Sequence, residues 1–253
     1  MWSGDYPFVL SNLILKDFRV RYRNMSLGML WSLLNPLVMM GVLTFVFTVI
    51  FPSKIENFAV FVLCGLVPFN FFSLSWSAAT VSIVDNVNLV KRSSVPREII
   101  PVASVLANCV HMSAQVALLL IFAAFFGGKV TWAWLWLPLL WAFFITFICG
   151  LGILFAAIDV YIRDARYVVE SANTMLFWLV PIFYSFTQVS PEYSAVYELN
   201  PVAGMIVALR DVILDGNPPR ITTITKLGFG SVAMLVFGLA VFNRLKRRFY
   251  DYL

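Results

Sequence analysis

The chain has 253 residues, of which 61% are hydrophobic and only 12% are charged, and its mean hydropathy is +0.87. A soluble core of this length cannot bury so much apolar surface, so these values exclude a soluble globular domain and require a bilayer as solvent. Six spans of about 20 residues would use roughly half of the chain, which excludes a separate soluble domain. We expect one all-α membrane domain over residues 1–253.

The first segment, within residues 1–26, is too charged to cross a membrane but is amphipathic. One helical face carries Leu10, Ile14 and Phe18, and the other carries Asn12, Lys16, Arg19 and Arg23. This pattern predicts an interfacial helix along anionic headgroups, with a basic stop signal that only fixes topology as the alternative. Because the first thirty residues lack a compact apolar run followed by small cleavage-site residues, we expect no signal peptide.

Apolar runs long enough to cross follow at residues 27–51, 58–79, 99–126, 134–157, 168–186 and 224–242. Spans one to five therefore occupy residues 27–186, and residues 223–253 hold span six and a tail. Six spans put both termini on one side of the membrane. Of the 18 Lys and Arg residues, only five fall on the opposite side: Lys54, Lys129, Arg210, Arg220 and Lys226. Both termini are therefore predicted to be cytoplasmic.

The outer loop, residues 187–222, begins with polar sequence and continues into the apolar run 202–214, which is too short to cross. As a helix, that run has one apolar face, formed by Val202, Met205, Ile206, Leu209 and Ile213. We expect a helix that enters the outer leaflet and returns at the mouth of a pathway. A helix lying flat on the outer surface is the alternative.

Few residues suggest chemistry of their own. His111 is the only histidine, and a hydrogen bond between helices explains it better than catalysis. Asp159 is followed by Arg163, Asp164 and Arg166, which favours an ion-pair network at a helix end over a buried proton carrier. The chain has no G-x-x-x-x-G-K-[ST] phosphate loop, so any ATP hydrolysis must belong to another polypeptide.

The cysteines and several glycines suggest packing rather than metal or redox chemistry. The cysteines lie in apolar stretches without metal-ligand spacing: Cys64, Cys109 and Cys149. The glycines fall in or beside apolar runs: Gly127, Gly128, Gly150, Gly152, Gly228 and Gly230. We expect these glycines to mark close contacts between helices.

Several aromatic residues lie inside spans and are candidates for lining a sugar path: Trp31, Phe177, Trp178, Phe183 and Tyr184. Flat rings stack on the apolar faces of sugars whatever the arrangement of the hydroxyls. The alternative is that these side chains are bulky groups that face lipid or lie in the interfacial belts. Asn35, a polar amide beside the helix-loosening Pro36, can line the same path.

The linker between spans two and three suits docking to a partner. Ser93 or Ser94 can cap a helix opened by Pro96, which would present Arg97 and Glu98 to the cytoplasm. A polar turn without a partner would have the same sequence features.

Short motifs recur in order along nearly the whole chain: Lys16-Asp-Phe-Arg-x-Arg-Tyr22, Leu27-Gly-Met-Leu-Trp-Ser-Leu-Leu-Asn-Pro36, Val95-Pro-Arg-Glu-Ile-Ile-Pro101, Tyr161-Ile-Arg-Asp164, Pro181-Ile-Phe-Tyr-Ser185, and Asn200-Pro201 with Arg210. In order and spacing they resemble the membrane subunits of ABC exporters for cell-surface polysaccharides, the ABC-2 type permeases for O-antigen, capsule and teichoic acid.

This resemblance implies a homodimer of six-helix subunits in the bacterial cytoplasmic (inner) membrane, docked to two copies of a cytoplasmic ATPase. The dimer would extrude a lipid-linked glycan through a channel between the subunits. ATP and Mg would be bound by the ATPase, and this chain would be a transport subunit without catalytic residues, metal, cofactor or nucleic-acid partner.

The resemblance also implies roles for particular residues. A cytoplasmic coupling helix in a cleft of the ATPase would include Val95, Pro96, Arg97 and Glu98. Two gate helices around residues 191–197 and 202–214 would close the exit, with Pro191, Tyr197, Asn200, Pro201 and Arg210. The N-terminal helix would lie where the substrate enters, and its basic residues can meet a diphosphate: Lys16, Arg19, Arg21 and Arg23.

Three other functions stay open on the sequence alone. An exporter of the same architecture for a drug or small lipid would need a closed pocket rather than a continuous groove. A membrane glycosyltransferase or acyltransferase would need an acidic or histidine centre, and a proton-coupled carrier would need an ionisable group near mid-membrane.

Overall fold

The computed structural model describes residues 5–22, 28, 30–52, 55–92, 95–188, 190, 192–193, 197 and 199–253. Within these ranges every regular element is a helix, which confirms the predicted all-α architecture. The long helices are α1 (Tyr6–Tyr22), α2 (Leu30–Phe45), α3 (Phe58–Asp85), α5 (Ile99–Phe125), α6 (Leu137–Tyr161), α7 (Ala165–Leu179), α9 (Pro201–Ile213) and α10 (Ile221–Leu245). Short elements are α4 (Val87–Arg92), α11 (Phe249–Tyr252) and the helical turns Val46–Ile50, Trp132–Trp136, Phe186–Gln188 and Lys246–Arg248.

Five helical segments in the described ranges are long and apolar enough to cross a membrane. They are Leu30–Ile50, Phe58–Asp85, Ile99–Phe125, Trp132–Tyr161 and Ile221–Arg248. Each of them overlaps one of the predicted spans, namely the first four and the sixth. Hydropathy therefore located these helices correctly, because the cost of exposing apolar side chains to water acts on each segment separately.

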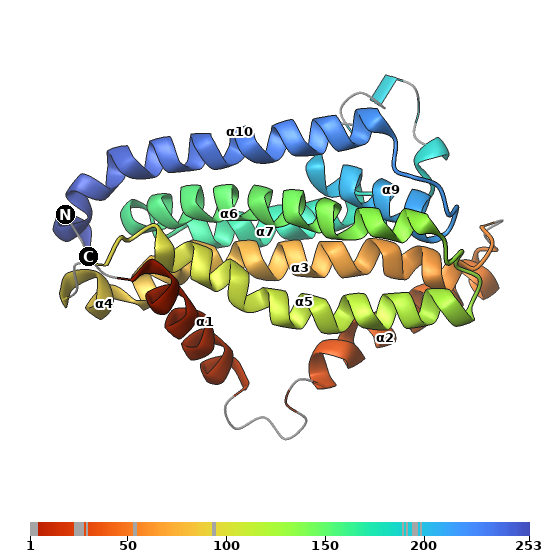
Figure 1. Cartoon of the computed structure of the whole chain (residues 1–253), viewed down its shortest axis with the longest axis horizontal. Helices are drawn as coiled ribbons and strands as arrows, with labels where there is room; N and C mark the ends of the chain where they lie inside the picture. Colours follow the sequence, from red (N-terminus) through yellow and green to blue (C-terminus); the bar gives the residue numbers. More distant parts are fainter. Residues whose placement is uncertain are drawn as a thin grey trace.

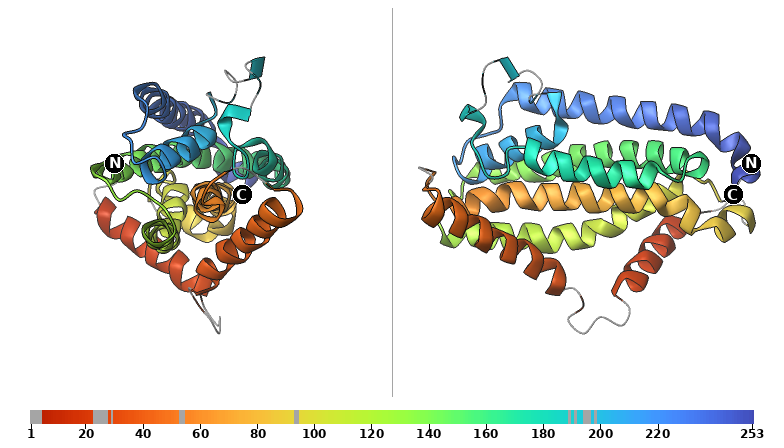
Figure 2. Two further views of the ribbon diagram at one scale, coloured as in Figure 1. Left: turned by 90° about the vertical axis from the view of Figure 1, so that its right-hand side faces the viewer. Right: turned by 180° about the vertical axis from the view of Figure 1, so that it is seen from behind.

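Helix α3 runs through the middle of the bundle, and α2, α5, α6, α7 and α9 pack around it (Figure 1). It is apolar on nearly all sides and buried over most of its length, as expected for a helix surrounded by others. Large side chains such as Phe71 and Phe72 are fully buried there. By contrast, α2 buries only Ser32, Pro36 and Leu43, and it diverges from the bundle on the same side as α1 (Figure 2).

Helices α6 and α10 pack with their backbones in close contact. A Cβ atom added to Gly238 of α10 would lie 2.3 Å from the carbonyl oxygen of Gly150 on α6. Helix α6 is also close to α3, because a Cβ atom added to Gly152 would lie 2.6 Å from the Cβ of Ala79. The predicted packing role is therefore confirmed for Gly150 and Gly152. It is wrong for Gly230, around which an added Cβ would meet nothing within 4 Å.

The fifth predicted span, 168–186, differs from the helix that forms there. Helix α7 begins earlier, at Ala165, and ends at Leu179, after which Val180 is extended with φ −80° and ψ 149°. Val180 precedes Pro181, and a proline disfavours the α conformation of the residue before it. The non-helical segment that follows α7 begins buried, because Val180 and Ile182 have no exposed surface. A Cβ at Gly65 of α3 would lie 2.9 Å from the Cα of Ile182, so glycine allows this backbone to approach.

The two ends of the bundle differ in character. Helix α1 begins, α4 lies and α10 ends at one end, whereas α9 lies at the other (Figure 1). We call these the terminal end and the α9 end.

Candidate functional site

A polar cleft lies along one face of α3. Its first part, about 610 Å³, lies among α2, α3 and α5 and is lined by Trp31, Ser32, Asn35, Phe69, Asn70, Ser73, Leu74, Ser77, His111 and Gln115. Its second part, about 370 Å³, lies among α2, α3 and α7 and is lined by Met39, Phe69, Ser73, Ser77, Glu170, Asn173, Thr174, Phe177 and Trp178. The two parts share Phe69, Ser73 and Ser77, so we treat them as one site, the polar cleft.

Each wall of the polar cleft is a stripe at helical spacing. On α3 the stripe is Asn70, Ser73 and Ser77, and on α5 it is His111 and Gln115. On α2 it is Ser32, Asn35 and Met39, and on α7 it is Glu170, Asn173, Thr174 and Phe177. Residues three, four or seven apart share a helix face, so four helices each turn a partly polar face inward.

Two buried amides tie the walls together. The Nδ2 of Asn173 donates to the Oγ of Ser77 at 3.1 Å, which joins α7 to α3. The Nε2 of Gln115 donates to the carbonyl of Ser32 at 3.0 Å, which joins α5 to α2. The amide oxygens of Asn173 and Gln115 accept no hydrogen bond from a described residue. Both oxygens are shielded from the cleft by the surrounding side chains, so the two amides serve to hold the walls together rather than to meet a ligand.

The predicted channel residues separate into two groups. Trp31, Asn35, Phe177 and Trp178 border the polar cleft. Phe183 and Tyr184 do not, because both lie beyond the end of α7.

Phe183 and Tyr184 instead take part in packing. The ring of Phe183 stacks on Phe47 at a centroid distance of 5.5 Å. The hydroxyl of Tyr184 lies 3.2 Å from that of Tyr197, and it donates to the carbonyl of Leu179.

Sequence reasoning missed most of the polar lining, including Asn70, Ser73, Ser77, Glu170 and Asn173. The available signal was the spacing of polar residues by three and four positions within apolar helices. A lone Ser or Asn in such a helix more often bonds its own backbone, as Thr80 does to the carbonyl of Trp76, so the signal is weak without the neighbouring helices.

At the terminal end, residues 95–98 form a turn between α4 and α5. The helix predicted to open at Pro96 begins at Ile99 instead. Ser93 and Ser94, the predicted caps, lie outside the described residues. The Nη1 of Arg97 donates to the carbonyl of Lys246 at 2.7 Å, and the Nζ of Lys246 lies 3.5 Å from the Oε2 of Glu98. The predicted coupling segment is thus bound to the C-terminal segment.

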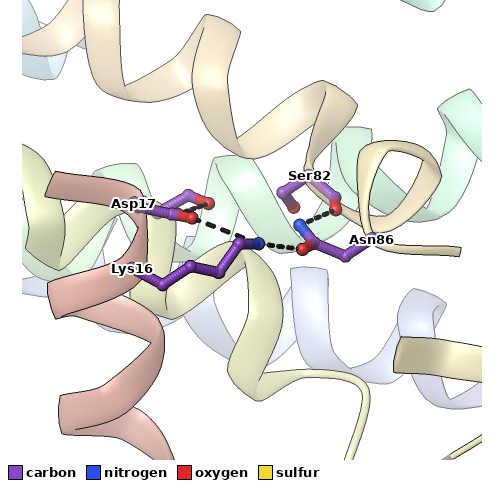
Figure 3. A network of polar contacts seen from close by, with 5 residues as sticks. Lys16, Asp17, Ser82 and Asn86 are labelled. Atoms are coloured by element: carbon purple, nitrogen blue, oxygen red, sulfur yellow. Dashed lines mark hydrogen bonds and ion pairs between the residues drawn. The ribbon is translucent and has the colours of Figure 1, made fainter. Parts of the chain in front are cut away.

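Helix α1 is joined to the terminal end by the network in Figure 3. Lys16 donates to the side-chain oxygen of Asn86, and its Nζ lies 3.6 Å from the carboxylate of Asp17. Asp17 in turn accepts a 2.9 Å hydrogen bond from the Oγ of Ser104 on α5. Asn86 also donates to the carbonyl of Ser82 at 2.8 Å. Lys16 therefore already has partners within the chain.

The other basic residues predicted near the substrate's entrance differ in placement. Arg19 is exposed on α1, and Arg21 lies in the last turn of that helix. Arg23 lies outside the described residues. Arg19 is thus the described basic side chain of α1 most open to a ligand.

At the α9 end, Asn200 and Pro201 start helix α9. The side chain of Asn200 accepts from the backbone N–H of Val202 at 3.0 Å, and Pro201 occupies the first helical position. Both are favourable there, since an Asn cap satisfies a free N–H and proline has none to satisfy. Pro191, with most of the first predicted gate helix, lies outside the described residues.

Arg210 braces the non-helical segment after α7. Its guanidinium donates to the carbonyl of Ile182 at 2.7 Å and to those of Phe61 and Tyr184 at 3.4 Å. Its Cζ lies 3.4 Å from the ring centroid of Phe61, a cation–π contact. A planar, multi-donor cation suits this set of contacts, through which Arg210 ties two carbonyls of the non-helical segment to one carbonyl of α3.

An ion pair lies where α6 meets α7. The Nη2 of Arg166 lies 3.6 Å from the Oδ2 of Asp159, which has no exposed surface. This confirms ion pairing at the helix end for Asp159 and Arg166, two of the four residues in the predicted network.

Comparison with known proteins gives consistent matches. The profile of the ABC-2 type transporter family matches residues 9–214. The O-antigen export system permease protein RfbA of Klebsiella pneumoniae is 30% identical over 250 residues, which cover 98% of this chain and 95% of that protein. An RfbA of Myxococcus xanthus is 27% identical over 249 residues, 98% and 96% of the two chains. The polysialic acid transport protein KpsM of Escherichia coli is 25% identical over 239 residues, 91% of each chain.

Proposed function

The chain belongs to the ABC-2 type transporter family, and from this premise we propose that it is the permease subunit of an ATP-driven exporter of a polysaccharide. The observation that carries the proposal is the polar cleft. Its amides and hydroxyls can exchange hydrogen bonds with sugar hydroxyls, and its rings can stack on sugar faces. Relatives named for O-antigen export and polysialic acid transport support a glycan as cargo.

The proposal includes six membrane crossings, namely the five candidate spans and α7 together with residues 180–185. A 15-residue helix is about 22 Å long, short of a hydrocarbon core of about 30 Å. In this proposal the non-helical residues 180–185 supply the remaining length. Their pairing with Arg210 supports this placement, since unpaired backbone is not tolerated in hydrocarbon.

An even number of crossings puts both termini on the same side, and the excess of Lys and Arg there favours the cytoplasm. In this orientation α1 would lie at the cytoplasmic interface, and α9 would enter the outer leaflet as the gate. The protein would be multi-pass in the bacterial inner membrane.

A second copy of the chain would complete the pathway. A hydrated glycan on a lipid diphosphate cannot cross hydrocarbon without a polar path. Trp31 and Trp178, at the border of the polar cleft, are 54% and 63% exposed in one subunit. A facing copy would cover these rings and close a channel between two clefts.

The energy would come from two copies of a cytoplasmic ATPase, which binds ATP and Mg. They would bind at the terminal end, at residues 95–98. Because those residues contact the C-terminal segment, movement of the ATPase would be passed to both α5 and α10.

The test is reconstitution of this chain with its cognate ATPase in proteoliposomes. ATP hydrolysis and the appearance of glycan on the far side are measured with a lipid-linked oligosaccharide. We expect both activities, and we expect both to fall on replacement of Asn173 or Gln115 by alanine. Absence of any ATPase that co-purifies, or a complex indifferent to every glycan offered, would count against the proposal.

A further inference from the structure

The charge of the polar cleft is unusual for this chain. Lys and Arg make up 18 of its residues and outnumber Asp and Glu, yet neither occurs among the described residues that line the cleft. Among the same described lining residues, the one acid is Glu170. The other polar lining side chains are amides, hydroxyls and His111.

We propose that the polar cleft selects an uncharged glycan, and that Glu170 disfavours polymers whose sugars carry carboxylates or phosphates. This inference rests on the proposed function, because it specifies the cargo of the same cleft. It distinguishes two classes of glycan, uncharged and anionic, between which the relatives do not decide. One relative is named for polysialic acid, an anionic polymer, and the others are named for O-antigen.

The first argument is desolvation. An anionic polymer that leaves water for a narrow protein cleft loses hydration at every charge, and proteins offset this loss with Lys, Arg or clustered N–H donors. Of the described cations, Arg97 and Lys246 lie at the terminal end, and Lys129 and Arg220 lie near the α9 end. A neutral glycan needs no such offset.

The second argument is repulsion. Glu170 is exposed in the first turns of α7, and no ion pair joins it to a described residue. Arg166, one turn before it on α7, pairs instead with Asp159 at 3.6 Å. A like charge within about 8 Å of it, at an effective dielectric near 20 and with salt screening, is disfavoured by roughly three- to tenfold. Each anionic sugar that passes Glu170 would meet this barrier.

The third argument is hydrogen-bond polarity. The Glu170 carboxylate is exposed, lines the cleft and can only accept hydrogen bonds. Sugar hydroxyls both donate and accept, so they can donate to this carboxylate. Carboxylates and phosphate diesters only accept, so they cannot.

The diphosphate of a lipid carrier does not conflict with this selection. Arg19 lies exposed on α1, away from the residues that line the cleft. A carrier diphosphate can stay with such basic groups at the membrane surface while the uncharged polymer alone enters the cleft.

The experiment compares two lipid-linked oligosaccharides of equal length on the same lipid, one of neutral hexoses and one with uronic acid at alternate sugars. Both are offered to the reconstituted complex with its ATPase, and stimulated ATP hydrolysis and transport are measured with each glycan. The result for the neutral glycan divided by that for the anionic glycan is the selectivity ratio. We expect the neutral glycan to be favoured by on the order of tenfold. Glu170→Gln is expected to reduce this ratio several-fold, and Glu170→Lys to reduce it further.

Asp164→Asn is the matched control, because it removes an exposed carboxylate just before the same helix but outside the cleft. It should leave the ratio unchanged. Equal handling of the two glycans by the unaltered complex, or a ratio insensitive to both Glu170 substitutions, would overturn the inference and leave the proposed function intact. A complex that handles neither glycan would overturn the proposed function, and the inference with it.

Discussion

The guanidinium of Arg97 donates a 2.7 Å hydrogen bond to the backbone carbonyl of Lys246, 149 positions away in sequence. Its Cζ also lies 5.9 Å from the ring centroid of Phe249, which has no exposed surface. In addition, the hydroxyl of Tyr161 donates to the carbonyl of Leu245 at 2.7 Å. The turn before α5, the end of α6 and the C-terminal segment therefore form one packed unit.

This unit predicts that the C-terminal segment contributes to coupling with an ATPase. Phe249→Ala leaves residues 95–98 unchanged but removes the ring beneath Arg97, at a cost of about 3–5 kcal/mol in a well-packed site. We expect a large loss of substrate-stimulated ATP hydrolysis in the reconstituted complex. Asp251→Asn, on the same short helix and exposed, should be nearly neutral.

A double-mutant cycle separates two roles of Arg97. If Arg97 acts through the C-terminal segment, Arg97→Ala combined with Phe249→Ala should lower substrate-stimulated ATP hydrolysis little more than either change alone. Additive losses would instead mean that Arg97 contacts the ATPase independently of the segment.

Arg210 should be essential for stability and not replaceable by lysine. An ammonium group cannot reach three carbonyls and stack on Phe61 at once, so Arg210→Lys should cost about 2–4 kcal/mol and Arg210→Met at least as much. Thermal unfolding of the purified protein in detergent measures this as a lower Tm. Arg220→Lys, at a side chain that is 70% exposed, is the control and should change little. An unchanged Tm for Arg210→Lys would refute the bracing role.

Two glycines on α10 should respond oppositely to the same change. Gly238→Ala forces a Cβ to within 2.3 Å of the Gly150 carbonyl oxygen, so α6 and α10 must separate and the protein should lose stability. Gly230→Ala meets nothing within 4 Å and should stabilise the helix by about 0.5–1 kcal/mol. The Tm values of the two variants, measured side by side, test the close crossing of α6 and α10.

The polar cleft should be reachable by water-soluble thiol reagents. In a background whose three cysteines are replaced by alanine, Ser73→Cys and Ser77→Cys should react with a maleimide, because both positions line the cleft. Ser75→Cys, on the same helix between them, should stay unlabelled because Ser75 has no exposed surface. Mass spectrometry gives the labelled fraction. Equal labelling at all three positions would mean that the cleft is not the water-accessible face of α3.

Hydropathy and composition predicted what depends on each segment alone. The sequence predicted an all-helical membrane protein with six spans, five of which coincide with helices long and apolar enough to cross, and it carries the ordered motifs of the family. It also predicted the close-packing glycines Gly150 and Gly152. Each of these follows from a local property, because the transfer of a helix into hydrocarbon is nearly a sum over its own residues.

One local signal was available but not used. Pro181 lies inside the fifth predicted span, and it ends α7 at Leu179 by pushing Val180 into an extended conformation. Hydropathy did not predict this helix end, because residues 168–186 are predominantly apolar and hydropathy does not depend on backbone conformation.

Only the tertiary structure decided which helix faces meet. Periodicity carries little information in helices that are apolar on all sides, so the sequence alone did not assemble a cleft from Asn35, Ser73, Gln115 and Asn173 on four helices. The same holds for Arg210 beside Ile182, and for Arg97 beside Lys246. These contacts join residues distant in sequence, and their stability comes from excluding lipid and water through packing, which no single segment specifies.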